Sequence, residues 1–192
     1  MTLFEAGHVY KRFTLANGEK VTLRVLRWED LDGLLMFINS LVEEKRGDTE
    51  SSLYTGFDRK VTREEEVEWL VQTLVAIEGE NVINVVADIN GKIIANGDVT
   101  RGSYKDTRHH GHLGLTVISK YRGQGIGRRM IETLVRESRR AGLRALDAEF
   151  LADNETARRA YEKASFKQAG IIPHKVFRNG RYFDGLIMAR EL

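Results

Sequence analysis

The stretch that most constrains this chain is a glycine-rich turn, YRGQGIGRR, at residues 121–129. Three alternating glycines stand between an apolar run at residues 113–118 and a helix-like run at residues 130–140. A strand that ends in such a turn and restarts as a helix exposes backbone N–H groups at the positive end of the helix dipole. Glycine also lets a ligand approach the backbone closely. The stretch therefore predicts an anion-binding socket of the kind that holds phosphate groups.

Hydrophobic periodicity and turn signals divide the rest of the chain into strands and helices. The pair Asn17-Gly18 predicts a type I′ hairpin, and the pairs at residues 90–91 and 179–180 mark two more hairpins. A capping box, Thr62 to Glu65, predicts a helix start. The polar residues 43–52 have no periodicity and predict a mobile loop. The expected strands are residues 8–15, 19–26, 82–89, 92–100, 112–118, 143–151, 166–177 and 181–189, and the expected helices are residues 28–42, 62–75, 130–140 and 154–164.

The expected order of elements is β–β–α–α–β–β–β–α–β–α–β–β. Hairpins in the first half and crossover helices in the second predict a mixed α/β fold with a central, mostly antiparallel, twisted sheet and helices on both faces. A chain of 192 residues with 42% hydrophobic residues suits one core. We expect one domain at residues 1–192, with its core at about residues 21–192 and an N-terminal hairpin extension at residues 8–26.

Composition argues against several classes of protein. No run approaches the roughly 20 apolar residues of a membrane span, and the first residues do not resemble a signal peptide. We therefore expect a cytoplasmic location and no membrane partner. The net charge of +2 argues against a nucleic-acid partner. The chain has no cysteine, which excludes thiolate metal sites and a cysteine-bound acyl intermediate.

Three histidines, His109, His110 and His112, form a cluster that invites a metal-binding hypothesis. The sequence offers no acidic or cysteine partner at a recognisable metal-ligand spacing. We therefore expect no metal site, and we interpret these histidines as structural residues or as contacts for a substrate.

Residues 122–127 have the form [Arg/Gln]-x-x-Gly-x-[Gly/Ala]. This differs from both common nucleotide loops, GxxxxGK[ST] and GxGxxG, because Arg128 stands where the last glycine of the second would be. A glycine-rich turn without a ligand is the alternative. Residues 154–166 add a second pattern, Asn-x-x-Ala-x-x-x-Tyr-Glu-Lys-x-x-Phe. Together the two stretches resemble the GCN5-related N-acetyltransferase (GNAT) superfamily, and the resemblance covers about residues 21–192.

One position departs from the family pattern. Ser165 stands where the family usually has glycine, directly before Phe166. The position caps a helix, so we expect local strain rather than a loss of activity.

The resemblance implies a binding site for acetyl-CoA. The backbone N–H groups of residues 124–127 would hold the pyrophosphate, with two arginines nearby. Backbone groups of residues 115–117, beside a bulge in that strand, would bind the pantetheine arm and direct an N–H at the thioester carbonyl. Asn154 would also hydrogen-bond the pantetheine. The expected cofactor-binding residues are Leu115, Thr116, Val117, Arg122, Gly123, Gln124, Gly125, Ile126, Gly127, Arg128 and Asn154.

The resemblance also implies two catalytic residues. Tyr161 would lie at the sulfur and protonate the departing thiolate, whose thiol has a pKa of about 8.5. Glu149 is the expected base, because its offset from Asn154 matches the catalytic glutamate of ribosomal-protein alanine acetyltransferases in this family. An ordered water as base, or Glu149 as a salt-bridged bystander, are the alternatives. Asp147 shares a strand face with Glu149, since side chains alternate along a strand.

We therefore expect an N-acetyltransferase that moves acetyl from acetyl-CoA directly to a primary amine in a ternary complex. The amine could belong to a small molecule, an amino acid or a protein N-terminus. The alternative is a non-catalytic acyl-CoA-binding sensor or scaffold. A C-terminal hairpin leaves a sheet edge that a homodimer could cover. A cationic acceptor would suit the acidic residues of the predicted loop, although a solvated loop is the simpler account of Glu43, Glu44, Asp48 and Glu50.

Overall fold

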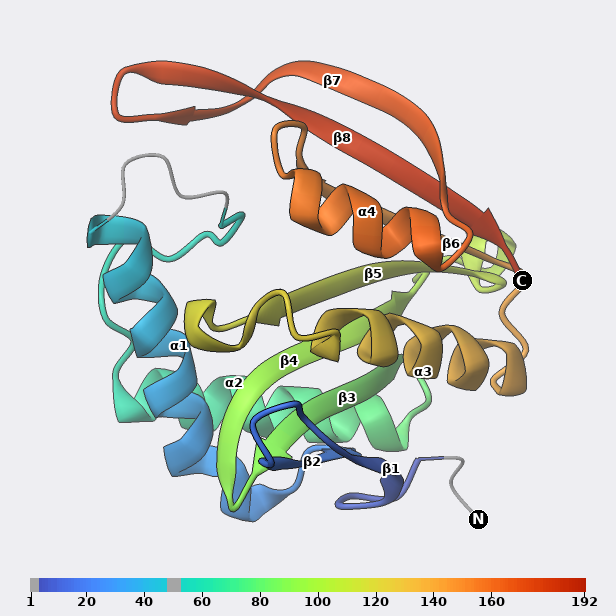
Figure 1. Ribbon diagram of the computed structural model, residues 1–192. Helices are drawn as coiled ribbons and strands as arrows, with labels where there is room; N and C mark the ends of the chain where they lie inside the picture. Colours follow the sequence, from blue (N-terminus) through green and yellow to red (C-terminus); the bar gives the residue numbers. More distant parts are fainter. Residues whose placement is uncertain (1–3, 48–52) are drawn as a thin grey trace.

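The computed structural model describes residues 4–47 and 53–192. These residues form one eight-stranded sheet with helices against both faces (Figure 1). The predicted order of strands and helices is confirmed. The strands are β1 (Val9–Thr14), β2 (Lys20–Arg24), β3 (Val82–Ile89), β4 (Lys92–Arg101), β5 (His110–Val117), β6 (Ala145–Leu151), β7 (Lys167–Arg178) and β8 (Arg181–Glu191). The α-helices are α1 (Leu31–Gly47), α2 (Arg63–Glu78), α3 (Ile126–Arg140) and α4 (Glu155–Lys163), and short 3-10 turns occupy Trp28–Asp30, Lys105–Thr107 and Ser119–Tyr121.

The sheet is mixed and mostly antiparallel, as expected. Its strand order is β1-β2-β3-β4-β5-β6-β8-β7. Within the described chain, β5 and β6 are the single parallel pair, and α3 is the crossover that parallel strands require. In Figure 1, α3 lies in front of β3 and β4, and α2 lies behind them. None of the helices in the described ranges is long and apolar enough to cross a membrane.

Strand β5 is paired along its length with β4 but only at its start with β6. Residues 111–117 pair with β4, whereas only residues 110–112 pair with β6. Beyond His112 the two parallel strands therefore separate, and the free edge of β5 faces a gap. The expected bulge is wrong, because the described β4–β5 register runs without a shift. Divergence from β6, rather than a bulge, exposes the backbone of residues 115–117.

Two of the three Asn-Gly pairs form type I′ turns. Both residues are left-handed at Asn90-Gly91 (φ 51° and 84°) and at Asn179-Gly180 (φ 50° and 77°). The first pair differs, because only Gly18 has a positive φ, 87°. There the side-chain oxygen of Asn17 accepts the N–H of Glu19 at 3.1 Å, which makes an Asx-type turn and a longer loop. The type I′ prediction for Asn17-Gly18 is therefore wrong, although the hairpin itself is present.

The expected loop at residues 43–52 is wrong at its beginning, because α1 continues to Gly47. Tertiary ion pairs hold this last part of the helix: Glu43 contacts Lys60 at 2.6 Å, and Glu44 contacts Arg122 at 2.5 Å. These two acidic residues are therefore not part of a solvated loop. Asp48 and Glu50, the other two acidic residues of that prediction, lie outside the described residues.

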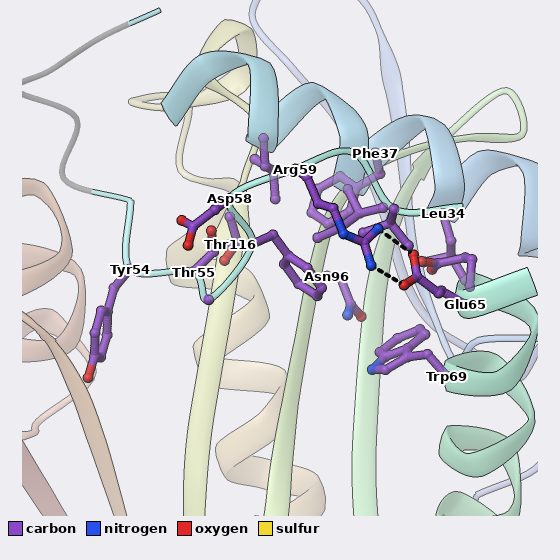
Figure 2. A pocket seen from close by; sticks show the side chains of 16 residues that line it. Leu34, Phe37, Tyr54, Thr55, Asp58, Arg59, Glu65, Trp69, Asn96 and Thr116 are labelled. Carbon is purple, nitrogen blue, oxygen red and sulfur yellow. Dashed lines mark hydrogen bonds and ion pairs between the residues drawn. The ribbon is translucent and has the colours of Figure 1, made fainter. Parts of the chain in front are cut away.

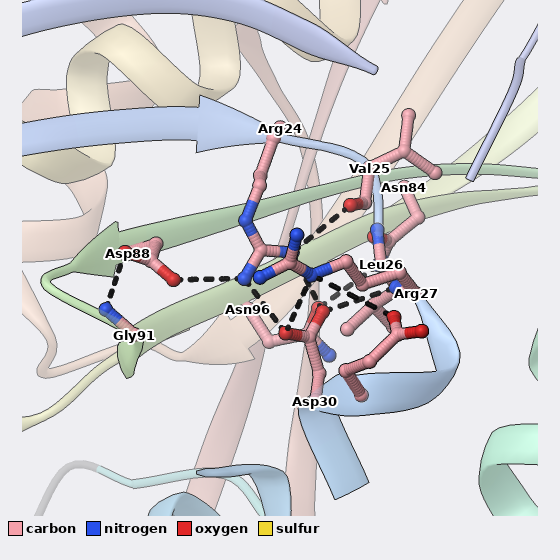
Figure 3. Close-up of polar contacts among 10 residues, drawn as sticks. Arg24, Val25, Leu26, Arg27, Asp30, Asn84, Asp88, Gly91 and Asn96 are labelled. Atoms are coloured by element: carbon pink, nitrogen blue, oxygen red, sulfur yellow. Dashed lines mark hydrogen bonds and ion pairs between the residues drawn. The ribbon is translucent and has the colours of Figure 1, made fainter. Parts of the chain in front are cut away.

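A buried ionic cluster anchors the start of α1 to the sheet (Figure 3). The guanidinium of Arg24 donates to both carboxylate oxygens of Asp30, at 2.6 and 2.7 Å, and to Asp88 at 2.8 Å. Asp30 also accepts the N–H of Arg27, and Asp88 accepts the N–H of Gly91. Charge-assisted bonds of this kind satisfy groups that would otherwise be costly to bury. The cluster thus sets the position of α1 relative to β3, and α1 forms one wall of the cavity described below.

Candidate functional site

The glycine-rich turn has the geometry of an open helix start. Gly125 is the N-cap of α3 in the left-handed conformation, with φ 77°, and Gly123 has φ 73°. The N–H of Arg122 donates to Ser119, and the next donor of the turn is the N–H of Arg129, which donates to Gly125. The N–H groups of residues 125–128 are the four that a helix start leaves without intrahelical partners, and those of Gly123 and Gln124 belong to the turn before it. They form the predicted socket at the end of β5.

The two arginines of the turn are held differently. The guanidinium of Arg122 donates to the carbonyl of Val117 at 2.8 Å and forms a two-pronged contact with Glu44 at 2.5 and 3.0 Å. Arg128 lies on the exposed side of α3, where it donates to Glu132 at 2.8 Å. These contacts fix the side chain of Arg122 beside the end of β5. The ion pair of Arg128 lies on the surface and contributes little, so Arg128 can exchange Glu132 for another partner.

A cleft of about 610 Å³ opens where β5 leaves β6. It brings together most of the site residues predicted from the sequence, which come from β5, the turn, β6 and α4. Those that line it are Leu115, Thr116, Val117, Arg122, Gly127, Glu149, Asn154 and Tyr161. The remaining predicted residues belong to the turn but not to the cleft lining, namely Gly123, Gln124, Gly125, Ile126 and Arg128.

Tyr161 lies on α4 with its ring in an aromatic cluster. The ring stacks on Phe150, with centroids 5.2 Å apart, and meets the edge of Phe166 at the same distance. Burial raises the pKa of the phenol, and the carboxylates of Asp98 and Asp147 raise it further. The hydroxyl therefore stays protonated at physiological pH, which suits a hydrogen-bond or proton donor.

Asn154 has a structural role at the start of α4. Its side-chain oxygen accepts the N–H of Ala157 at 3.0 Å, which makes it the N-cap of the helix. The residue also lines the cleft. Capping fixes the orientation of the amide and therefore presents it to the cleft in one defined way.

Glu149 projects from β6 into the same cleft. Its Oε1 accepts a hydrogen bond from the hydroxyl of Tyr54 at 3.1 Å and lies 3.3 Å from Nζ of Lys175. Its side chain is 17% exposed. Tyr54 thus connects the carboxylate to the segment that follows the undescribed residues 48–52, and Lys175 connects it to β7.

The histidine cluster has an acidic partner that the sequence alone did not reveal. Asp147 contacts His112 through Oδ2 and Nδ1 at 2.6 Å, and contacts His110 through Oδ1 and Nε2 at 3.1 Å. Asp147 stands at no recognisable metal-ligand spacing from these histidines in the sequence. The parallel pairing of His112 with Asp147 brings them together, and strand register is not visible in sequence spacing. The hydrogen bond to Asp147 raises the pKa of His112, against the opposing effect of burial.

Sequence reasoning also missed Asp98, which lines the cleft from β4. Burial raises the pKa of this carboxyl group to about 6, while the charge of His112 acts in the opposite direction. The alternation of side chains along β4 could have indicated which face of the sheet Asp98 takes. Only the register with β5, however, shows that Asp98 stands opposite Gly114. Among the residues that the structure describes, no group of three or more histidines and carboxylates is arranged to hold a metal ion.

A second cavity, of about 810 Å³, lies beside the cleft, between α1, α2, the segment 54–61, the middle of β4 and the end of β5 (Figure 2). Its walls are largely apolar and include Phe37 from α1 and Trp69 from α2. Three residues line both spaces, namely Tyr54, Asn96 and Thr116. The two spaces therefore meet at the edge of β5, so that molecules bound in each could react there.

Comparisons with known proteins agree with this geometry. A model of the Acetyltransferase (GNAT) family matches residues 39–166. A Bacillus subtilis (strain 168) protein, provisionally named phosphinothricin acetyltransferase YwnH, is 26% identical over 177 residues, covering 90% of this chain and 99% of that protein.

Two solved structures share the fold. One is a ribosomal-protein-alanine N-acetyltransferase from Brucella melitensis, with 24% identity, a TM-score of 0.75, and coverage of 88% of this chain and 99% of that one. The other is yncA from Salmonella typhimurium with its cofactor acetyl-CoA, with 20% identity, a TM-score of 0.74, and coverage of 90% and 94%. With the family match over two thirds of its length, this chain belongs to the GNAT family of acetyltransferases.

Proposed function

We propose that this protein transfers the acetyl group of acetyl-CoA to a primary amine by direct attack in a ternary complex. The observation that carries the proposal is the cleft between β5 and β6, in which Tyr161 and Glu149 face an edge of β5 that pairs with no described strand beyond His112. The cleft ends near the anion socket of the glycine turn. A long molecule with an anionic group at one end and a thioester at the other fits this arrangement.

In this proposal, acetyl-CoA lies along β5. The N–H groups of residues 123–128 bind the pyrophosphate, assisted by Arg122 and, after exchange of its surface pair, by Arg128. The free edge of residues 115–117 pairs with the amides of the pantetheine arm, and Asn154 binds it from α4. Support comes from the edge of β5 that no described strand pairs with, and from the similar fold of yncA, whose structure was solved with acetyl-CoA.

The transfer needs two proton movements. The amine must lose a proton as its nitrogen bonds to the acetyl carbon, and Glu149 accepts that proton either directly or through an ordered water. The carbon–sulfur bond then breaks, and Tyr161 donates its phenolic proton, or a strong hydrogen bond, to the thiolate sulfur. A backbone N–H of residues 115–117 would stabilise the oxyanion, a contribution of roughly 3–4 kcal/mol in comparable sites. Burial of Tyr161 favours its protonated form and so supports this assignment.

The second cavity would bind the acceptor amine, because it meets the cleft at Thr116. Enclosure by two helices favours a small molecule or an amino acid over a protein N-terminus. The relatives leave both classes open: the name of the Bacillus protein refers to phosphinothricin, and that of the Brucella structure to ribosomal-protein alanine. A cytoplasmic location and a homodimer stay predictions.

Release of free thiol from acetyl-CoA over a panel of primary amines tests the proposal, with mass spectrometry to identify the acetylated product. We expect turnover with at least one amine and an added mass of one acetyl group on that amine. Thermal stabilisation by CoA with no thiol release on any amine would favour the non-catalytic binder instead.

A further inference from the structure

The second cavity, called the acceptor cavity from here on because it would bind the acceptor amine, has one buried acidic residue that forms no charge pair. Glu66 lies on α2, is 5% exposed and lines the cavity. Within the described residues its carboxyl group forms no hydrogen bond or ion pair, and burial alone raises its pKa to about 7. Ionised carboxylates are rarely buried without a partner, because removal from water costs several kcal/mol.

The other charged groups in the cavity wall already have partners. Arg59 forms a two-pronged contact with Glu65, which Figure 2 shows at the rim, and Asp58 pairs with Lys45 at 2.8 Å. The remaining titratable group in the wall, Tyr54, donates its hydroxyl to Glu149. The side chains that α1 contributes to the wall are apolar, and the strands contribute Asn96 and Thr116. Glu66 is therefore the one wall charge in the described chain without a counter-ion.

The position of Glu66 separates it from the reaction. It lines the acceptor cavity but not the cleft, whereas Asn96 and Thr116 line both. In the proposed function the proton of the attacking amine goes to Glu149, directly or through an ordered water, so that step needs no second carboxylate. Glu66 is thus suited to a second cationic group, at the end of the acceptor remote from the thioester.

Resting on the proposed function, we infer that Glu66 binds a distal cation, so that the preferred acceptor is an aliphatic diamine or another primary amine with a second cationic group. The ammonium forms a charge-assisted hydrogen bond with the carboxylate. The methylene chain between the two nitrogens packs on the apolar wall, in which Phe37 is buried and Trp69 half-buried. Aromatic faces also stabilise a nearby cation.

Three acceptors of matched length test this inference in the full chain: 1,5-diaminopentane, pentylamine and 5-aminopentanoic acid. We expect kcat/KM to be at least about tenfold higher for the diamine than for pentylamine, the size of one charge-assisted hydrogen bond, and lowest for the acid. The preference should grow as the pH rises through about 7, because Glu66 ionises there while the distal ammonium stays charged.

The isosteric variant Glu66→Gln should remove the preference for the diamine and leave kcat/KM for pentylamine within about twofold. Glu64→Gln is the matched control, because this exposed glutamate on the same helical turn does not line the cavity and its replacement should leave the preference intact. Equal turnover of diamine and pentylamine by the native protein would overturn the inference, as would a preference that survives in Glu66→Gln.

Calorimetric titration with 1,5-diaminopentane separates this inference from the proposed function. If no amine is acetylated but the diamine binds the native protein and not Glu66→Gln, the proposed function fails and the cation site stands. If amines are acetylated but the diamine binds native protein and variant alike, the cation site fails and the proposed function stands.

Discussion

His112 and Asp147 are joined by a hydrogen bond of 2.6 Å between Nδ1 and Oδ2, across the short parallel pairing of β5 and β6. This contact lies where the two strands begin to separate, so it marks the closed end of the cleft. Because the carboxylate of Asp147 occupies Nδ1, Nε2 is the ring nitrogen of His112 left for any other contact. The pair is therefore both a link between the strands and a titrating group on the cleft wall.

Asp147→Asn should lower the pKa of His112 toward its ordinary value of 6.5, since the hydrogen bond to the carboxylate is the main cause of the raised pKa. A raised histidine pKa contributes stability that is fully present below the unfolded value and lost as the pH rises through the folded one. The variant should therefore lose more stability at pH 6 than at pH 8. Titration of the imidazole by NMR measures the pKa. The exposed control Asp106→Asn should leave it unchanged, and an unaltered pKa in Asp147→Asn would contradict the assignment.

Tyr161→Phe should lower turnover by about tenfold or more and leave the affinity for CoA nearly unchanged, because it removes the proton donor but keeps the stacked ring. Steady-state kinetics and calorimetry with CoA provide the two measurements. Tyr10→Phe is the control, since Tyr10 is a partly buried tyrosine on β1 that does not line the cleft. Unchanged turnover would remove Tyr161 from the mechanism.

Glu149→Gln should lower turnover by about a hundredfold if the carboxylate accepts the proton of the amine. The KM for acetyl-CoA should stay within about twofold, because glutamine still accepts the hydrogen bond from Tyr54. Single-turnover kinetics isolate the chemical step. The exposed α4 variant Glu155→Gln serves as control. Equal rates in Glu149→Gln and native protein would assign the proton to an ordered water that does not need Glu149.

Ser165→Gly should stabilise the protein by about 1 kcal/mol. Ser165 follows α4 in the left-handed conformation with φ 63°, where any side chain beyond glycine is strained. Urea denaturation measures the change in the free energy of unfolding. Ser165→Ala should bring no such gain, since alanine keeps the Cβ atom, and turnover should be the same in both variants. A Gly variant no more stable than the Ala variant would show that the serine is not strained.

Arg24→Met should destabilise the protein by roughly 3–5 kcal/mol, because it leaves Asp88 buried without its counter-ion and Asp30 with only the 3.6 Å contact to Arg27. Chemical denaturation of this variant and of the exposed control Arg12→Met compares the two sites. We expect less than about 1 kcal/mol at Arg12. A similarly small change at Arg24 would mean that the cluster in Figure 3 does not hold the start of α1.

Much of the fold and part of the site follow from local sequence alone. The capping box from Thr62 to Glu65 forms as predicted, and the turns at residues 90–91 and 179–180 adopt the conformation that Asn-Gly favours. The glycine turn begins a helix after a strand, as its spacing predicted. These features depend on contacts within a few residues, and the sequence shows such contacts directly.

What the sequence by itself determined is therefore the order of elements, the glycine turn and the residues of the family pattern. Only the tertiary structure decided how β5 separates from β6, that Asp147 meets two histidines, that Glu44 extends α1 and holds Arg122, and that Glu66 lies unpaired in an apolar cavity. The physical reason is the same in each case. These contacts join residues that are distant along the chain, and strand register and helix packing, rather than local spacing, bring them together.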